Sequence, residues 1–315
     1  MAAINAGIQV RRDTPIEALE FIRRADQAGV PVVWSTFGGS VPDGLGVYAA
    51  AAVTTRSVTF GTSVVPTYPR HPVVLAAQAL TIEDLAPGRL RLGIGTSHRS
   101  TITGALGIEM GKPLDHLREY LTILRSLLWS GSVDHEGEYC RVHAALPEGT
   151  MPPRTPILIS ALRSNAFQLA GELADGAITW VCPIPYLVET AIPAMAQGAS
   201  KVDRARPPII AHVPVIISEN RDVVRRLAHE QLGFYAQLPF YMSMFVAAGF
   251  PIGPGGSFPD ELIDALVVSG SIDQITCRLE EIHAAGIDEL LLAPTPVHDR
   301  NAEEDALFAL VTNRA

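Results

Sequence analysis

His98 is the residue whose type and position best suit proton transfer in this chain. It follows a short apolar run, 90–94, and then Gly95, Thr96 and Ser97. Glycine and small hydroxyl residues at the end of a strand allow a flat ligand to approach the backbone closely. A histidine beside such a ligand, with an unperturbed pKa of about 6.5, can exchange a proton near neutral pH. We therefore take His98 as the first candidate for a catalytic group.

Other ionisable residues are weaker candidates than His98 for proton transfer. Glu109 and Tyr68 lie in flanking loops and are the fallback proton donors. His71, between Arg70 and Pro72, is more typical of a helix cap than of a catalyst. The other histidines lack the HExxH or Cys/His spacing of metal sites, so no metal site is predicted. These histidines are His116, His135, His143, His212, His229, His283 and His298.

Short apolar strands alternate with amphipathic helices along the whole chain. Parallel βα units covered on both faces are the arrangement that this alternation indicates. About eight such units favour a closed (β/α)8 TIM barrel over an open sheet. The strands are expected at 4–10, 30–34, 58–65, 90–94, 156–160, 177–181, 209–218 and 289–293. The main helices are expected at 15–28, 46–55, 73–85, 114–128, 165–173, 186–199, 222–249, 272–285 and 301–310.

Two glycine- and proline-containing stretches, 100–113 and 250–260, are expected as insertion loops outside this repeat. A small hairpin is possible within the irregular stretch 130–153. Gly93-x-Gly95 lacks the third glycine and the immediate helix of a dinucleotide fingerprint, which disfavours a Rossmann domain. One group of aromatic residues at loose helical spacing is either barrel packing, the default, or a wall facing a substrate. This group is Tyr235, Phe240, Tyr241 and Phe245.

Composition excludes several classes of protein. The net charge of −9 argues against a nucleic-acid partner, which requires a basic face. No apolar run approaches the roughly 20 residues of a membrane span, and the N-terminus lacks a signal-peptide layout. The 3 cysteines are too few and too scattered for a disulfide framework. We expect a cytoplasmic protein with a single domain over residues 1–315 and no membrane partner.

Three stretches, in order along the chain, resemble the luciferase-like monooxygenase superfamily, and more closely its branch dependent on the deazaflavin coenzyme F420. The first is Gly61-Thr62-Ser63-Val64 with Arg70-His71-Pro72. The second is Leu85-Ala86-Pro87-Gly88-Arg89 followed by Leu92-Gly93-Ile94-Gly95-Thr96. The third is Leu169-Ala170-Gly171-Glu172-Leu173-Ala174-Asp175-Gly176. The resemblance covers nearly the whole chain.

The resemblance implies a TIM barrel with insertions, a flavin or deazaflavin at its C-terminal face, a small-molecule substrate and a homodimer. It also implies a cis peptide bond at Ser63–Val64, against which the ring system leans. The loop after the fifth strand matches the phosphate-binding region, where free N–H groups, the helix dipole and an arginine favour an anion. The cofactor-binding residues expected on this basis are Thr36, Ser63, Val64, Gly95, Thr96, Ser97, Ala161, Leu162, Arg163 and Ser164.

The chain departs from the branch after the second strand. Many relatives place an Asp-His pair there as the catalytic acid or base, whereas this chain has Ser35 and Thr36. Many relatives also have a glutamate where His98 stands. Oxidation of an alcohol needs a general base, whereas reduction of an activated double bond needs only a weak acid or water. The expected function is therefore hydride transfer from reduced F420 to a small organic substrate, with reduction of an activated C=C or C=N bond.

Two alternatives remain open beside this reading. One is an FMN-dependent monooxygenase of the same fold, because the fold alone does not separate F420 from FMN. The other is a non-catalytic flavin-binding protein, supported by the missing histidine and opposed by the retained small residues around the cofactor site.

Overall fold

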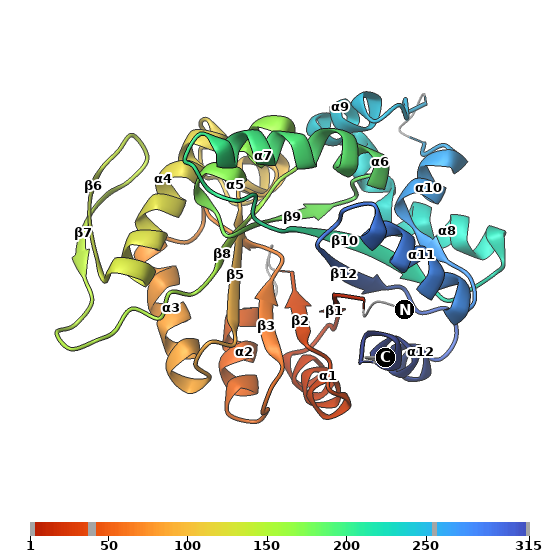
Figure 1. The fold of residues 1–315 in the computed structure, drawn as a ribbon, viewed down its shortest axis with the longest axis horizontal. Helices are drawn as coiled ribbons and strands as arrows, with labels where there is room; N and C mark the ends of the chain where they lie inside the picture. Colours follow the sequence, from red (N-terminus) through yellow and green to blue (C-terminus); the bar gives the residue numbers. More distant parts are fainter. Residues whose placement is uncertain (1–3, 37–41, 254–256, 313–315) are drawn as a thin grey trace.

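The chain forms a closed barrel of eight parallel strands surrounded by helices, as the sequence predicts (Figure 1). The computed structural model describes residues 4–36, 42–253 and 257–312. Around the barrel each strand pairs with the next, and β12 returns to β1. The barrel strands are β1 (Ala6–Val10), β2 (Val32–Ser35), β3 (Thr59–Thr62), β5 (Leu90–Gly95), β8 (Ile157–Ser160), β9 (Gly176–Trp180), β10 (Ile209–Ile216) and β12 (Glu289–Pro294).

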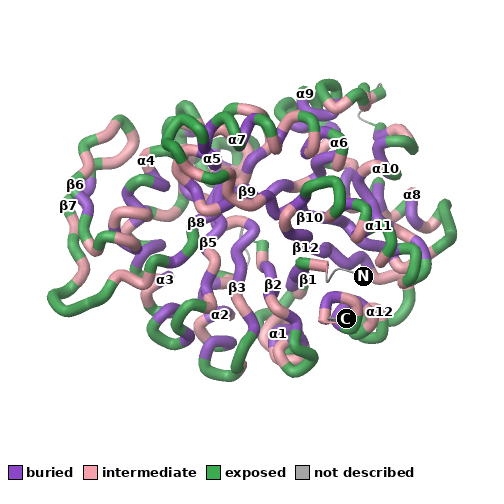
Figure 2. The backbone as a smooth tube through the Cα atoms, viewed as in Figure 1, coloured by how far each residue is buried: buried purple, intermediate pink, exposed green. Residues whose placement is uncertain are grey.

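Helices cover the outside of this barrel, and most of them have one buried side and one exposed side (Figure 2). None of the helices in the described part of the chain combines the length and the apolar character needed to cross a bilayer. The longer ones are α1 (Pro15–Ala28), α2 (Gly44–Ala52), α3 (Pro72–Leu85), α4 (Pro113–Arg125), α5 (Ser164–Leu173), α7 (Ile192–Ser200), α8 (Arg221–Leu232), α9 (Pro239–Ala247), α11 (Ile272–Ala284) and α12 (Arg300–Thr312).

The helix boundaries follow the capping residues of the sequence. Thr14 caps α1, where its hydroxyl accepts a hydrogen bond from the Glu17 amide at 3.2 Å. Gly29 ends α1 in the left-handed conformation, with φ of 83°. His71 caps α3, since its Nδ1 accepts a hydrogen bond from the Val73 amide at 3.3 Å. The interpretation of His71 as a cap is thus confirmed.

The helical region expected over 222–249 is present, but it is not one continuous helix. α8 ends at Leu232, a 3-10 turn covers Gly233–Gln237, and α9 begins at Pro239. Leu238 is extended, with φ of −89° and ψ of 122°. A residue before proline disfavours the helical conformation, and proline has no N–H for the helix ladder. The chain therefore turns at Leu238, and α9 is free to take a different direction from α8.

The other irregular segments hold more structure than expected. Ser100–Ala105 forms one π-helical turn inside the predicted 100–113 loop. The helix expected over 186–199 consists of α6 (Ile184–Tyr186), a π-helical turn and then α7. A helix and a short strand that the sequence analysis did not predict, α10 (Asp260–Leu266) and β11 (Val268–Ser269), precede α11. Part of the predicted 250–260 loop lies outside the described residues. The hairpin is present as β6 (Ser132–Glu136) and β7 (Arg141–Ala145), and β4 (Val65–Pro66) pairs with β5.

Trp34 fills the interior of the barrel. Its side chain is fully buried, at 0 % exposure, within an inner apolar cluster. Both neighbouring strands have a glycine against the indole. A Cβ on Gly61 would lie 2.2 Å from Trp34 Cε3, and a Cβ on Gly7 would lie 2.7 Å from Trp34 Nε1. Beneath the indole, the Arg91 guanidinium lies 4.8 Å from the ring centre and pairs with Glu289 at 2.7 Å. Only glycine at these two positions leaves room for the indole.

The substitution Gly61→Ala should therefore destabilise the protein by about 1–3 kcal/mol, the usual range for overpacking a core. Urea unfolding measures this change, and near-UV circular dichroism reports the displaced tryptophan. Gly46→Ala in α2 is the matched control, because a Cβ there meets nothing within 4 Å. The control should be neutral or more stable by about 0.5–1 kcal/mol. Equal stability of the two variants would show that the barrel interior adjusts freely around Trp34.

Candidate active site

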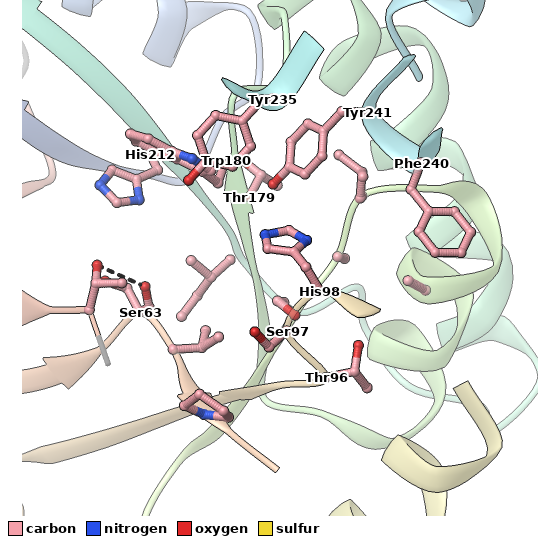
Figure 3. A pocket seen from close by; sticks show the side chains of 18 of the residues that line it. Ser63, Thr96, Ser97, His98, Thr179, Trp180, His212, Tyr235, Phe240 and Tyr241 are labelled. Carbon is pink, nitrogen blue, oxygen red and sulfur yellow. Dashed lines mark hydrogen bonds between the residues drawn. The ribbon is translucent and has the colours of Figure 1, made fainter. Parts of the chain in front are cut away.

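A large cavity opens over the carboxyl ends of the barrel strands (Figure 3). Its volume is about 1120 Å³. Ligand pockets usually measure about 300–1,000 Å³, so this cavity is large enough for an extended ligand together with a second small molecule. Side chains from seven of the barrel strands, or from the residues just after them, line it, and α5 and α9 supply further walls. This is the end of a (β/α)8 barrel at which active sites form.

One side of the cavity joins the ends of the first three strands by hydrogen bonds. Gln9 Nε2 donates to Thr36 Oγ1 at 2.9 Å, and Thr36 Oγ1 donates to the Ser63 carbonyl at 3.2 Å. The Ser63–Val64 peptide is cis, which confirms the expectation from the sequence. Val64 packs on the inner apolar cluster around Trp34. The result is a fixed surface that is polar at Thr36 and Ser63 and apolar at Val64.

The end of β5 places His98 in the middle of the cavity (Figure 3). Thr96 and Ser97 also line the cavity, and Ser97 has a left-handed φ of 58° that turns the chain immediately before His98. Gly95 is not among the lining residues. A Cβ there would lie 2.3 Å from Ser160 Oγ, so its small size serves close packing between β5 and β8.

His98 is half-buried, and burial lowers its pKa below the ordinary value of 6.5. The sequence reasoning used the unperturbed value, so this shift is a correction. The imidazole lies 5.9 Å from the ring of Tyr241 and 6.2 Å from the ring of Tyr235. No side chain in the described part of the structure accepts or donates a hydrogen bond at its ring nitrogens. At neutral pH His98 is thus a largely uncharged group that is free to contact a ligand.

The sequence reasoning missed two residues of the cavity wall, Trp180 and His212. They are direct partners in the register of β9 and β10, and their ring centres lie 4.2 Å apart. Only 7 % of His212 is exposed, and its Nε2 has no hydrogen-bond partner in the described structure. Burial and the nearby Arg11 lower the pKa of His212 to about 3, so it is neutral. Both residues could have been found from the sequence by listing the large side chains near the ends of the predicted barrel strands.

Three of the four aromatic residues with helical spacing also face the cavity. Tyr235, Phe240 and Tyr241 line it, whereas Phe245 is buried and packs against Phe258 at 5.4 Å. Phe245 is thus a packing residue, as the default interpretation has it, whereas Tyr235, Phe240 and Tyr241 form part of a cavity wall. α9 follows the break at Leu238, and its Tyr241 points into the cavity beside Tyr235 and His98 (Figure 3).

The N-terminus of α5 forms another end of the cavity. Ala161, Leu162, Arg163 and Ser164 all line it. The Arg163 carbonyl accepts the amides of Ala166 and Phe167, at 2.9 and 3.2 Å, and no side chain caps the helix. Within the described structure no group accepts the amides of residues 164 and 165, and the exposed Arg163 guanidinium has no ion-pair partner. Free amides, the helix dipole and a cation together can bind an anionic group.

The two fallback proton donors do not line the cavity. Glu109 is exposed on the segment before α4. Tyr68 is turned into a cluster on α4, where its ring stacks on His116 at 3.9 Å with an interplanar angle of 9°. The structure thus brings His98 together with Thr36, Ser63, Val64, Thr96, Ser97 and the 161–164 loop. It leaves Glu109, Tyr68 and Gly95 outside this set.

Known proteins share both the sequence and the architecture of this chain. A 5,10-methylenetetrahydromethanopterin reductase from Archaeoglobus fulgidus is 26% identical over 92% of this chain and 93% of its own. An F420-dependent glucose-6-phosphate dehydrogenase from Microbacterium testaceum is 33% identical over 71% of this chain and 70% of its own.

A solved structure of an F420-dependent secondary alcohol dehydrogenase superposes with a TM-score of 0.83. It is 18% identical and covers 99% of this chain and 100% of its own, and therefore supports the fold. The family profile for luciferase-like monooxygenase matches residues 2–289, which is most of the 315-residue sequence. The chain belongs to the luciferase-like monooxygenase family.

Proposed function

We propose that the protein is an F420-dependent oxidoreductase that transfers a hydride between the deazaflavin and a small organic substrate. The observation that carries this proposal is one continuous cavity that joins the surface at Ser63–Val64, His98 and the free N-terminus of α5. Proteins with similar sequences include dehydrogenases that are named as F420-dependent. The positions that line the cavity supply a place for a ring, a proton-transfer group and an anion site.

The residues present fit such a cofactor. A flat ring system can lie against Val64 and the cis peptide, between Thr36 on one side and Ser97 on the other. Its anionic tail can reach the free amides of residues 164 and 165 and the guanidinium of Arg163. The cavity volume of about 1120 Å³ leaves room beside the ring for a substrate. FMN has the same general shape, so an FMN-dependent monooxygenase is the second candidate, and titration with each cofactor separates the two.

When it is bound, the cofactor supplies the hydride chemistry, and the protein supplies binding, orientation and proton transfer. Thr36, Ser63 and Val64 would hold the ring, and the N-terminus of α5 would hold the anionic tail. His98 exchanges a proton at its imidazole: the protonated ring gives one during reduction, and the neutral ring takes one during oxidation. We propose reduction of an activated C=C or C=N bond, because Ser35 and Thr36 leave the end of β2 without an ionisable side chain and such a reduction needs only a weak acid or water.

Arg163→Ala should weaken the binding of F420 by about 1–3 kcal/mol, which is roughly 5- to 150-fold in Kd. The charge-assisted bond to the anionic tail is the interaction lost. Fluorescence titration of the purified protein with F420 measures the change. Arg141→Ala on the β6–β7 hairpin is the control, since Arg141 is exposed and pairs only with Glu136 there. Equal affinity of both variants for intact F420 would place the anion site elsewhere, and saturable binding of FMN alone would favour the second candidate.

The pH dependence of turnover should report His98. Burial disfavours the charged imidazolium, so the pKa of His98 lies below 6.5, and the acid form accumulates only as the pH falls through that value. Reduction should therefore accelerate steadily as the pH falls from about 8 to below about 6, whereas oxidation, which uses the neutral imidazole, should stay nearly constant down to about pH 6.5 and slow only at lower pH.

His98→Gln should remove this dependence and lower kcat by about 10²–10⁴-fold, with F420 affinity nearly unchanged. His143→Gln is the matched control, because His143 is exposed on the hairpin. A His98→Gln variant with normal kcat and an unaltered pH profile would assign proton transfer to water or to another side chain.

The homodimer implied by the resemblance is a further part of the proposal. Exposed aliphatic side chains lie on α3, at Val74 and Leu85, which are 52 % and 41 % exposed, and at Val53, which directly follows the neighbouring helix α2 and is 64 % exposed. A second copy covering these helices would bury them. Light scattering coupled to size-exclusion chromatography should give twice the 33.7 kDa chain mass. Val74→Asp should shift the mass toward that of one chain, and a monomeric parent protein would refute the proposal.

A further inference from the structure

Five rings form a continuous wall over the reactive part of the cavity, and we call this wall the aromatic chamber. Its members are His98, Trp180, His212, Tyr235 and Tyr241. Neighbouring ring centres lie 4.2 to 6.2 Å apart, from Trp180–His212 to His98–Tyr235. Tyr235 joins the two ends, with ring-centre distances of 5.7 Å to Trp180 and 4.9 Å to Tyr241 (Figure 3). Such walls favour flat ligands, because rings stack face to face or edge to face.

The aromatic chamber carries no charge at neutral pH. Burial lowers the pKa of both histidines and raises that of both tyrosines, so all four side chains remain neutral. Arg11 is a charged side chain that acts on His212 and Tyr235 from the cavity wall, and its Nη1 donates to Gln231 Oε1 at 2.8 Å. Arg12, also on the cavity wall, is paired with Glu304 at 2.6 Å. A phosphate or carboxylate placed among the five rings would lose its hydration, and none of these five side chains would offer it a positive charge.

The chamber does retain unused hydrogen-bonding groups. The hydroxyl protons of Tyr235 and Tyr241 have no acceptor among the described residues. His212 is more than nine-tenths buried, and its Nε2 has no partner. Buried polar groups left without partners are costly, so a ligand that satisfies them gains affinity and specificity. Hydroxyl donors are satisfied by an acceptor such as a carbonyl oxygen.

We propose, building on the proposed oxidoreductase function, that the aromatic chamber binds an uncharged, flat, conjugated carbonyl compound. Its carbonyl oxygen accepts hydrogen bonds from the Tyr235 and Tyr241 hydroxyls, and its flat body lies between the rings and the cofactor site. A C=C bond conjugated with a carbonyl is electron-poor, which is the type of bond that the proposed reduction needs. The chamber thus differs from a site for a phosphorylated sugar, the substrate named for several relatives.

Equilibrium binding to the full-length protein tests this proposal without relying on turnover. Trp180 is the tryptophan among the described lining residues, and its fluorescence should be quenched by a bound ligand. The probes are chalcone, which is an uncharged flat enone, stilbene, which is its hydrocarbon counterpart, and glucose 6-phosphate. We expect saturable quenching by chalcone, binding of stilbene at least 10-fold weaker, and no saturation with glucose 6-phosphate.

The tyrosine variants locate the hydrogen bonds. Tyr241→Phe and Tyr235→Phe should each weaken chalcone about 2- to 12-fold, the effect of one lost hydrogen bond, and leave stilbene unchanged. Tyr120→Phe is the matched control, because the Tyr120 hydroxyl is buried without a partner and does not line the cavity. Chalcone affinity equal to that of stilbene, or unchanged in both tyrosine variants, would overturn the inference.

Titration of the same samples with F420 separates the two proposals. Saturable F420 binding together with preferred binding of glucose 6-phosphate would overturn the inference and leave the oxidoreductase function standing. Failure to bind F420, with chalcone bound as expected, would overturn the proposed function and leave the chamber as a carbonyl-binding site.

Discussion

The placement of the Trp34 indole inside the barrel is the constraint on which the rest of the structure depends. The ring is larger than the space a closed parallel barrel normally leaves to one side chain, and glycines on both neighbouring strands provide that space. The Arg91–Glu289 pair closes the barrel below the indole, and Val64 packs above it. The surface at Ser63 and Thr36 is therefore supported from beneath by a rigid aromatic ring. A ligand bound there lies against a packed core, so its position is fixed by the barrel and not by a loop.

Electrostatics divides the cavity into two parts with different chemistry. Near α5, the free amides and the exposed Arg163 provide positive potential in contact with solvent. Near the barrel axis, His98 and His212 are kept neutral by burial, and the tyrosines keep their protons. A charged tail and an uncharged reacting group can thus occupy one cavity without competing for the same side chains. This separation follows mainly from depth, because desolvation acts on the inner residues, and Arg11 adds to it at His212.

Local sequence patterns were sufficient for the barrel and for one side of the site. Thr14, Gly29 and His71 act as predicted, because caps and turns depend on a few adjacent residues. The residues at the ends of β3 and β5 follow from motifs within the same strands. The places of Trp180 and His212 in the cavity wall were not predicted. Each lies in a strand without a recognisable motif, and the two come together only because β9 pairs with β10. The lowered pKa of His98 was also beyond the sequence, because burial by Tyr235 and Tyr241 comes from a segment more than 130 residues away.

The break at Leu238 has a consequence for how this protein can diversify. The segment that carries Tyr235 and Tyr241 contributes no strand to the barrel and begins and ends outside the repeating βα units. Its buried side chains, such as Met244 and Phe245, pack in the main core, whereas Phe240 and Val246 are exposed and can change without disturbing that core. The barrel strands form the floor of the cavity, and residues 233–247 form part of its wall without contributing a strand. Exchange of residues 233–247 between relatives is therefore a way to alter this part of the cavity wall while the barrel strands stay the same.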